Sequence, residues 1–122
     1  MKNTKKTLVL GASDNPSRYS YLAIDRLQKQ GHPVLAIGKK KASVLGVTIE
    51  TEPIPFEDID TVTLYLNSQH QAAYYNYILS LNPKRVVFNP GTENEELELI
   101  LKENKVPFME ACTLVLLSTG QY

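Results

Sequence analysis

The sequence predicts a single-domain α/β protein with a doubly wound, Rossmann-like sheet of about five parallel strands in the order 3-2-1-4-5. Three observations support this class. The chain has 122 residues, which fits one domain, so a single domain over residues 1–122 is expected. Short apolar runs typical of strands alternate with amphipathic segments typical of helices. The connections are short, as in right-handed crossovers between parallel strands. The central strands beginning near Thr7 and Thr61 should therefore pair in parallel.

The expected strands are short apolar runs, several of them rich in β-branched residues. They lie at residues 7–11, 33–37, 47–49, 60–66, 85–88 and 106–109. Runs this short with little polar alternation indicate strands that are buried on both faces by helices.

Helices are expected between these strands. The first carries Tyr21, Ile24 and Leu27 on one face and ends at Gly31. Two later helices begin at apparent capping boxes, in which a Ser or Thr side chain accepts from the N3 amide and the N3 side chain reaches back. The two boxes are Ser68-x-x-Gln71 and Thr92-x-x-Glu95.

The remaining segments are less regular. Residues 12–18 are small and polar, which predicts a loop. Pro53 and Pro55 impose another loop, and residues 55–58 are expected to form a helical turn. Residues 113–117 are apolar and have two interpretations, a turn of helix or an extra strand at the edge of the sheet.

The charge distribution favours an anionic partner. The 13 basic and 13 acidic residues cancel, but residues 1–41 carry a net charge of +7 and the remainder −7. Such an asymmetry suits a nucleic acid or a phosphorylated small molecule. A neutral chain without an aromatic RNA-binding signature favours the small molecule, so no nucleic-acid partner is expected.

The composition also narrows the location and the metal chemistry. One cysteine, Cys112, and two isolated histidines, His32 and His70, argue against a disulfide framework and a metal site. No apolar run approaches the ~20 residues that span a membrane. A cytoplasmic protein with no membrane partner is therefore expected.

Ligands of doubly wound sheets bind beyond the carboxyl ends of the strands. The residues that follow the strands here are small, polar or basic. They are residues 11–15, 38–41, 67–68, 89–92 and 110–112. Glycines and helix N-termini in such positions suit a nucleotide with phosphates. The first loop begins at Gly11 but lacks the second and third glycines of the dinucleotide fingerprint.

Three lysines, Lys39, Lys40 and Lys41, follow the second strand, where an NAD-binding domain carries an acidic residue for the ribose 2′-hydroxyl. Lysines would attract a phosphorylated ribose instead. The candidates are the 2′-phosphate of NADP and the 3′-phosphate of coenzyme A (CoA). The alternative interpretation is a solvated lysine run on a loop.

Signatures of catalysis are missing from the sequence. It has no Tyr-x-x-x-Lys pair, P-loop, G-x-S-x-G or H-E-x-x-H motif. We interpret His32 and His70 as structural or exposed and Cys112 as a small apolar residue. Tyr19 and Tyr21 are weaker candidates to flank an adenine. No catalytic residue and no metal ligand is assigned.

Together these loops resemble the small single-domain CoA-binding proteins, which are similar to the CoA-binding domain of the succinyl-CoA synthetase alpha subunit. The resemblance covers roughly residues 6–112 and depends on the order and spacing of several segments. They are residues 9–16, 20–21, 31–40, 62–68, 89–96 and 110–112. The family often has a proline before the lysine and another after the cysteine. This chain has Gly38 or Lys39 and Thr113 there, which leaves open whether Lys39 or Lys40 acts.

The resemblance implies a bound CoA or acyl-CoA. Residues of the first loop would surround the diphosphate, a lysine would meet the ribose phosphate, and later loops would line the adenine, ribose and pantetheine. The candidate residues are Gly11, Ala12, Ser13, Asp14, Asn15, Arg18, Ser20, Gly38, Lys39, Lys40, Leu66, Asn67, Ser68, Pro90, Gly91 and Thr92. Leu66, Asn67 and Ser68 would lie on the adenine or ribose side, and residues 90–92 along the pantetheine.

The synthetase's phosphorylated histidine lies in a second domain that this chain lacks, so the resemblance implies binding without catalysis. The alternative is an NADP-binding small reductase or reductase subunit. A protein partner is compatible with either function.

Overall fold

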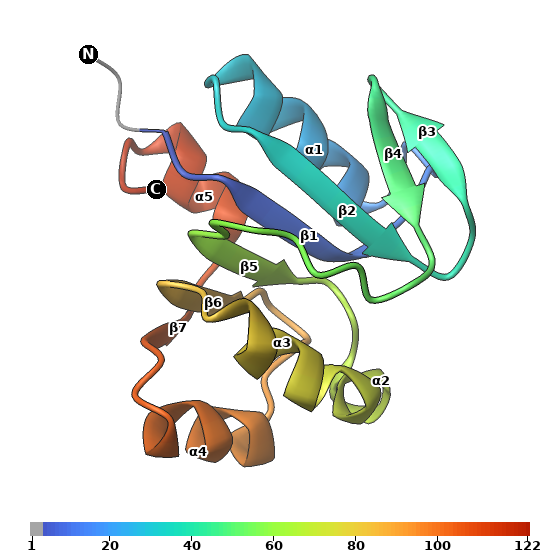
Figure 1. The fold of residues 1–122 in the computed structure, drawn as a ribbon. Helices are drawn as coiled ribbons and strands as arrows, with labels where there is room; N and C mark the ends of the chain where they lie inside the picture. The colour runs from blue at the N-terminus through green and yellow to red at the C-terminus, as the bar shows by residue number, and fades with distance from the viewer. Residues whose placement is uncertain (1–3) are drawn as a thin grey trace.

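The computed structural model describes residues 4–122 as one sheet with helices on both faces (Figure 1). The elements in chain order are β1 (Thr7–Ala12), α1 (Tyr19–Lys29), β2 (Val34–Gly38), β3 (Ala42–Val44), β4 (Val47–Glu50), β5 (Thr61–Leu64), α2 (Ser68–Gln71), the 3-10 turn η1 (Ala72–Tyr74), α3 (Tyr75–Leu81), β6 (Arg85–Phe88), α4 (Glu95–Glu103), β7 (Phe108–Glu110) and α5 (Thr113–Ser118). The strand order is β3-β4-β2-β1-β5-β6-β7.

The predicted doubly wound topology is confirmed. The strands β4, β2, β1, β5 and β6 lie side by side in the predicted order 3-2-1-4-5, and all four of their pairings are parallel. Thr7 lies opposite Thr61 in that register. The strand expected at residues 106–109 corresponds to β7, which continues the sheet in parallel. The strand β3 was not expected, and it pairs antiparallel with β4 at the other edge.

Alternate residues of the central strands point to two separate cores. Leu8 and Leu10 pack with Leu97 of α4 on one face, and Val9 packs with Ile24 of α1 on the other. All five of these side chains are fully buried. This burial on both faces explains why β1 is an uninterrupted apolar run. Within residues 4–122, none of the helices has the length and apolarity needed to cross a membrane.

The predicted capping box at Ser68 is wrong. The N-cap of α2 is Asn67, whose side-chain oxygen accepts from the His70 N–H at 3.2 Å. Asparagine caps as well as serine does, so two adjacent candidates could not be separated from the sequence. The expected single helix is also broken into α2, η1 and α3.

The predicted capping box at Thr92 is wrong as well. Asn94 is the N-cap of α4, and its side chain accepts from the Leu97 N–H at 3.2 Å. Thr92 instead donates its hydroxyl to the Asn89 carbonyl at 2.8 Å. The hydroxyl therefore shapes the loop before the helix.

Two further expectations are settled by the structure. The helical turn predicted at residues 55–58 is wrong, because that segment is irregular. Pro55 disfavours helical backbone at Ile54, and Asp58 adopts a left-handed conformation with φ of 58°. Residues 113–117 form the helix α5 and do not extend the sheet.

Glu98 on α4 gives the fold a pH dependence. Burial, together with the neighbouring Glu110 carboxylate on β7, raises the pKa of Glu98 to about 7. The folded state thus holds this proton more tightly than the unfolded chain. Its stabilising contribution is complete below the ordinary pKa of 4.5 and is lost as pH rises to about 7.

Replacing Glu98 with glutamine should therefore raise the melting temperature at about pH 8 and leave it nearly unchanged at about pH 4. The expected gain is about 0.5–1 kcal/mol, since solvent screens the pair. Melting curves of wild type and variant at both pH values test this. Glu103→Gln, an exposed change on the same helix, is the control. A gain of equal size at both pH values would contradict the prediction.

Candidate functional site

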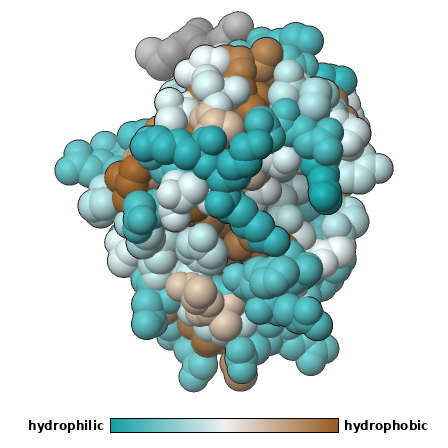
Figure 2. All heavy atoms as spheres, turned by 90° about the vertical axis from the view of Figure 1, so that its right-hand side faces the viewer, coloured by the Kyte–Doolittle hydropathy of each residue, from teal (hydrophilic) through white to brown (hydrophobic). Residues whose placement is uncertain are grey.

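A cavity of about 510 Å³ lies at the carboxyl ends of β1, β2, β5 and β6. The chain winds in opposite directions from β1, so this is the switch point of the sheet, where ligands of such folds bind. Figure 2 views the side to which the strand arrows of Figure 1 point, and hydrophilic side chains there surround a hollowed centre. The lining residues are Gly11, Ala12, Ser13, Asp14, Arg18, Tyr19, Ser20, Lys39, Lys40, Tyr65, Leu66, Asn67, His70, Pro90, Gly91 and Thr92.

The structure brings most of the candidate residues to this one cavity. Of the candidate set, Asn15, Gly38 and Ser68 lie outside the lining. Tyr65 and His70 line it although the sequence analysis did not select them. Tyr65 was read as part of a longer strand, but β5 ends at Leu64. His70 was read only as structural or exposed; it is exposed and lies in the short helix α2 above the cavity.

Two glycines bring the strand ends together. Gly11 has φ of 98°, and a Cβ there would lie 2.8 Å from the backbone of Tyr65 and Leu66. Gly38 is buried, and a Cβ there would overlap the Ala12 carbonyl oxygen. Only glycine permits these approaches, so both residues shape the floor of the cavity through the backbone.

The loop between β1 and α1 is fixed by its own side chains. The Asn15 N–H donates to Ser13 Oγ at 3.1 Å. Asn15 Oδ1 accepts from the Ser17 N–H at 3.0 Å and from the Ser17 hydroxyl at 2.8 Å. Asn15 therefore acts on the loop conformation, which is consistent with its place outside the lining.

The N-terminus of α1 is open toward the cavity. Its N-cap, Arg18, makes no side-chain cap, and the first turn contains no acidic residue. In the described part of the chain the N–H groups of Tyr19 and Ser20 have no hydrogen-bond partner. By contrast, α4 is capped by Asn94 and has acidic residues in its first turn. The positive end of α1 is thus left for an anion.

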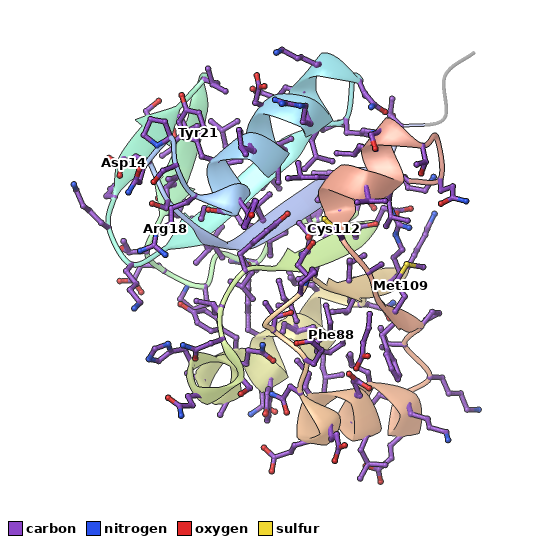
Figure 3. The ribbon with its side chains drawn as sticks, turned by 180° about the vertical axis from the view of Figure 1, so that it is seen from behind. Asp14, Arg18, Tyr21, Phe88, Met109 and Cys112 are labelled. Carbon is purple, nitrogen blue, oxygen red and sulfur yellow. The ribbon has the colours of Figure 1, made fainter. Side chains whose placement is uncertain are left out.

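The charges around the cavity favour an anion as well. Arg18 and Lys39 line it without an acidic partner among residues 4–122. Lys40 Nζ lies 3.8 Å from the Asp14 carboxylate, the one acidic side chain in the lining. Figure 3 shows Asp14 and Arg18 on the loop that leads into α1. The geometry therefore separates the lysines: Lys39 is free and Lys40 is already paired.

A buried glutamine joins two walls of the cavity. The Gln71 side chain is fully buried and donates to the carbonyls of Leu66 at 2.9 Å and Thr92 at 2.8 Å. Its own oxygen accepts from the Asn94 amide at 2.9 Å. The loops after β5 and β6 are therefore held at a fixed separation. Gln71 lies at the N3 position of the expected capping box, so its role between the two loops was not apparent from the sequence.

A second, smaller cavity of about 240 Å³ adjoins the first. It is lined by Tyr19, Tyr65, Asn89, Pro90, Cys112 and Leu114. Figure 3 shows Cys112 where the chain passes from β7 to α5. Burial raises the pKa of the Tyr65 hydroxyl above its ordinary value, and the Thr113 and Thr63 side chains beside it act in the opposite direction. Among residues 4–122, no group of three or more potential metal-ligating side chains comes together.

The chain is similar to a known sequence family and to several solved structures. Residues 5–118 match the sequence model of a family described as a CoA binding domain. No curated protein matches the sequence. The structure is similar to a crystal structure of an uncharacterized protein, with 56% identity, a TM-score of 0.96, and coverage of 99% of this chain and 100% of that chain.

Two further solved structures, one archaeal and one bacterial, share less sequence identity with this chain. A hypothetical protein from Pyrococcus horikoshii OT3 shares 25% identity with a TM-score of 0.81, over 90% of this chain and 79% of its own. A protein from Thermus thermophilus shares 22% identity with a TM-score of 0.85, over 98% and 91% of the two chains. At that identity, the second similarity concerns the fold alone.

Proposed function

The chain belongs to the CoA binding domain family, and we propose that the cavity at the carboxyl ends of its strands binds coenzyme A or an acyl-CoA. One observation supports this most strongly. The open N-terminus of α1 and two cations without acidic partners, Arg18 and Lys39, meet at the same cavity. A ligand with several phosphates suits this arrangement, because backbone N–H groups and side-chain cations can share its charge.

The diphosphate is assigned to the start of α1. The N–H groups of Tyr19 and Ser20 offer two donors there, and the Ser13 and Ser20 hydroxyls offer two more. The Arg18 guanidinium adds a charged donor with a planar geometry that suits phosphate oxygens. Asp14 holds Lys40 beside this loop and would remain next to the bound anion.

The 3′-phosphate on the ribose is assigned to Lys39. Its ammonium group is exposed at the cavity, whereas Lys40 must leave the Asp14 carboxylate to bind a phosphate. Leu66 and Asn67 are assigned to the adenine and ribose, with the Tyr19 ring as a stacking candidate. The pantetheine is assigned to residues 90–92, on the side of the second cavity.

We propose binding without chemistry of its own. No side-chain hydrogen bond joins a nucleophile to a base among the residues lining the cavity. The lysines would equally suit the 2′-phosphate of NADP, which keeps a reductase as the competing function. The family match favours CoA. The ligand that the protein prefers, CoA or NADP, distinguishes the two functions.

A thermal-shift panel of CoA, dephospho-CoA, NADP and NAD tests the proposal. At about 100 times its dissociation constant, a ligand adds ~2.7 kcal/mol of stability, which for a domain of this size is roughly 10 °C. CoA should give the largest shift, dephospho-CoA a smaller one because it lacks the 3′-phosphate, and NAD none. An NAD shift equal to that of CoA would refute the phosphate argument, and a larger NADP shift would favour the reductase.

A further inference from the structure

The two cavities adjoin. Tyr19, Tyr65 and Pro90 line both of them. Pro90 also begins the segment assigned to the pantetheine. A CoA bound as proposed would therefore carry its sulfur end toward the smaller cavity, which the nucleotide itself does not fill.

The smaller cavity has an uncharged lining. It consists of two tyrosine rings, Pro90, Leu114, the Cys112 thiol and the Asn89 amide. A half-buried cysteine in such surroundings behaves as a small apolar residue. A charged group placed here would lose its hydration and find no charge partner in the lining.

The polar side chains of the lining are engaged with neighbouring protein groups. Asn89 is fully occupied, because its amide donates to Thr63 Oγ1 at 2.7 Å and the Leu64 carbonyl at 2.8 Å, while its oxygen accepts from the Thr113 N–H at 2.8 Å. The Tyr65 hydroxyl is buried beside the Thr63 and Thr113 side chains, so it is not presented to the cavity. Neither group presents a free donor to a ligand, so an apolar group suits this lining.

From these features we infer that the smaller cavity holds the acyl group of a short, uncharged acyl-CoA. The inference rests on the proposed function and narrows its ligand class. A volume of about 240 Å³ equals that of roughly eight water molecules, which suits an acyl group of a few carbons. A dicarboxylic acyl group is disfavoured, because its free carboxylate would lie in the uncharged lining.

Calorimetric titration of the intact chain with CoA, butyryl-CoA and succinyl-CoA tests this inference. The butyryl and succinyl groups have the same number of carbons and differ in one terminal carboxylate. Butyryl-CoA should bind at least tenfold more tightly than CoA, since its alkyl carbons leave water. Succinyl-CoA should bind no more tightly than CoA.

Two variants of α5 locate the effect. Leu114→Trp fills the smaller cavity and should abolish the butyryl advantage while the dissociation constant of CoA stays within about twofold. Val115→Trp is the matched control, because Val115 is 53% exposed and lines neither cavity.

The failures of the two proposals are distinguishable. If CoA binds and butyryl-CoA binds no more tightly, or if Leu114→Trp retains the butyryl advantage, the acyl inference is overturned and CoA binding stands. If neither CoA nor any acyl-CoA binds, the proposed function fails together with the inference. The ligand series on the wild-type chain decides this even where a variant does not fold.

Discussion

Replacing Asn89 with leucine should lower the free energy of unfolding by about 3 kcal/mol. Asn89 is 2% exposed, and its side chain bonds to β5 and to the start of α5. Leucine has a similar size but cannot hydrogen-bond, so the Thr113 N–H and the other buried partners lose this contact. Each buried group left without a partner costs about 1–3 kcal/mol. Chemical denaturation followed by circular dichroism measures the loss.

Asn104→Leu is the matched control for this prediction. The Asn104 side chain also donates to a backbone carbonyl, that of Ile100 at 2.8 Å, but it is exposed at the end of α4. Water can replace that bond, so the cost should stay within about 0.5 kcal/mol. Equal losses for both variants would mean that the amide network around Asn89 does not hold the strand ends together.

The sheet order was predictable because strands that are buried on both faces appear in the sequence as short, uninterrupted apolar runs. Strands β1, β2, β5 and β6 are short apolar runs separated by amphipathic helices, and few topologies satisfy that alternation. The strand at residues 47–49 was expected and is β4, but the hairpin that joins it to β3 was not, because Ala42–Val44 is not an apolar run. The hairpin turn at Leu45 and Gly46 has positive φ at both positions, 51° and 85°, where Asn-Gly is the usual signal.

The place of the cavity was predictable, but its internal bonding was not. Residues that follow parallel strands meet at one edge of the sheet, which is why most of the candidates line the same cavity. The hydrogen bonds by which Gln71 and Asn89 join separate loops were not predicted, because their partners lie far along the chain. An amide in a sequence does not reveal whether it will cap, bind or cross-link.

The ion pairs of the three lysines could not be predicted from the sequence either. In sequence, Lys39, Lys40 and Lys41 are equivalent neighbours on one loop. In the fold, Lys40 meets Asp14 from the loop after β1, and Lys41 Nζ lies 3.5 Å from the Glu50 carboxylate on β4. These pairings depend on the packing of separate strands, and they leave Lys39 as the one lysine of the three without an acidic partner among residues 4–122.

Changing Lys39 and Lys40 together to alanine should weaken CoA binding more than tenfold. A charge-assisted bond to phosphate in a partly buried site contributes roughly 1.5–3 kcal/mol, whereas an exposed ion pair such as Lys40 with Asp14 contributes about 0–1 kcal/mol. The melting temperature of the free protein should therefore hardly change. Because Lys39 is unpaired, Lys39→Ala alone should account for most of the loss in calorimetric titration.

Dephospho-CoA and Lys41→Ala provide the controls for that prediction. Dephospho-CoA has no 3′-phosphate to lose, so its affinity should fall much less in the Lys39→Ala variant than that of CoA. Lys41 carries the same charge two residues away, but it pairs with Glu50 and lies outside the cavity lining, so its removal should change CoA affinity less than threefold. Equal losses for CoA and dephospho-CoA would mean that the lysines act through a general field, which screening by salt would weaken. In that case the 3′-phosphate would have to be placed elsewhere in the cavity.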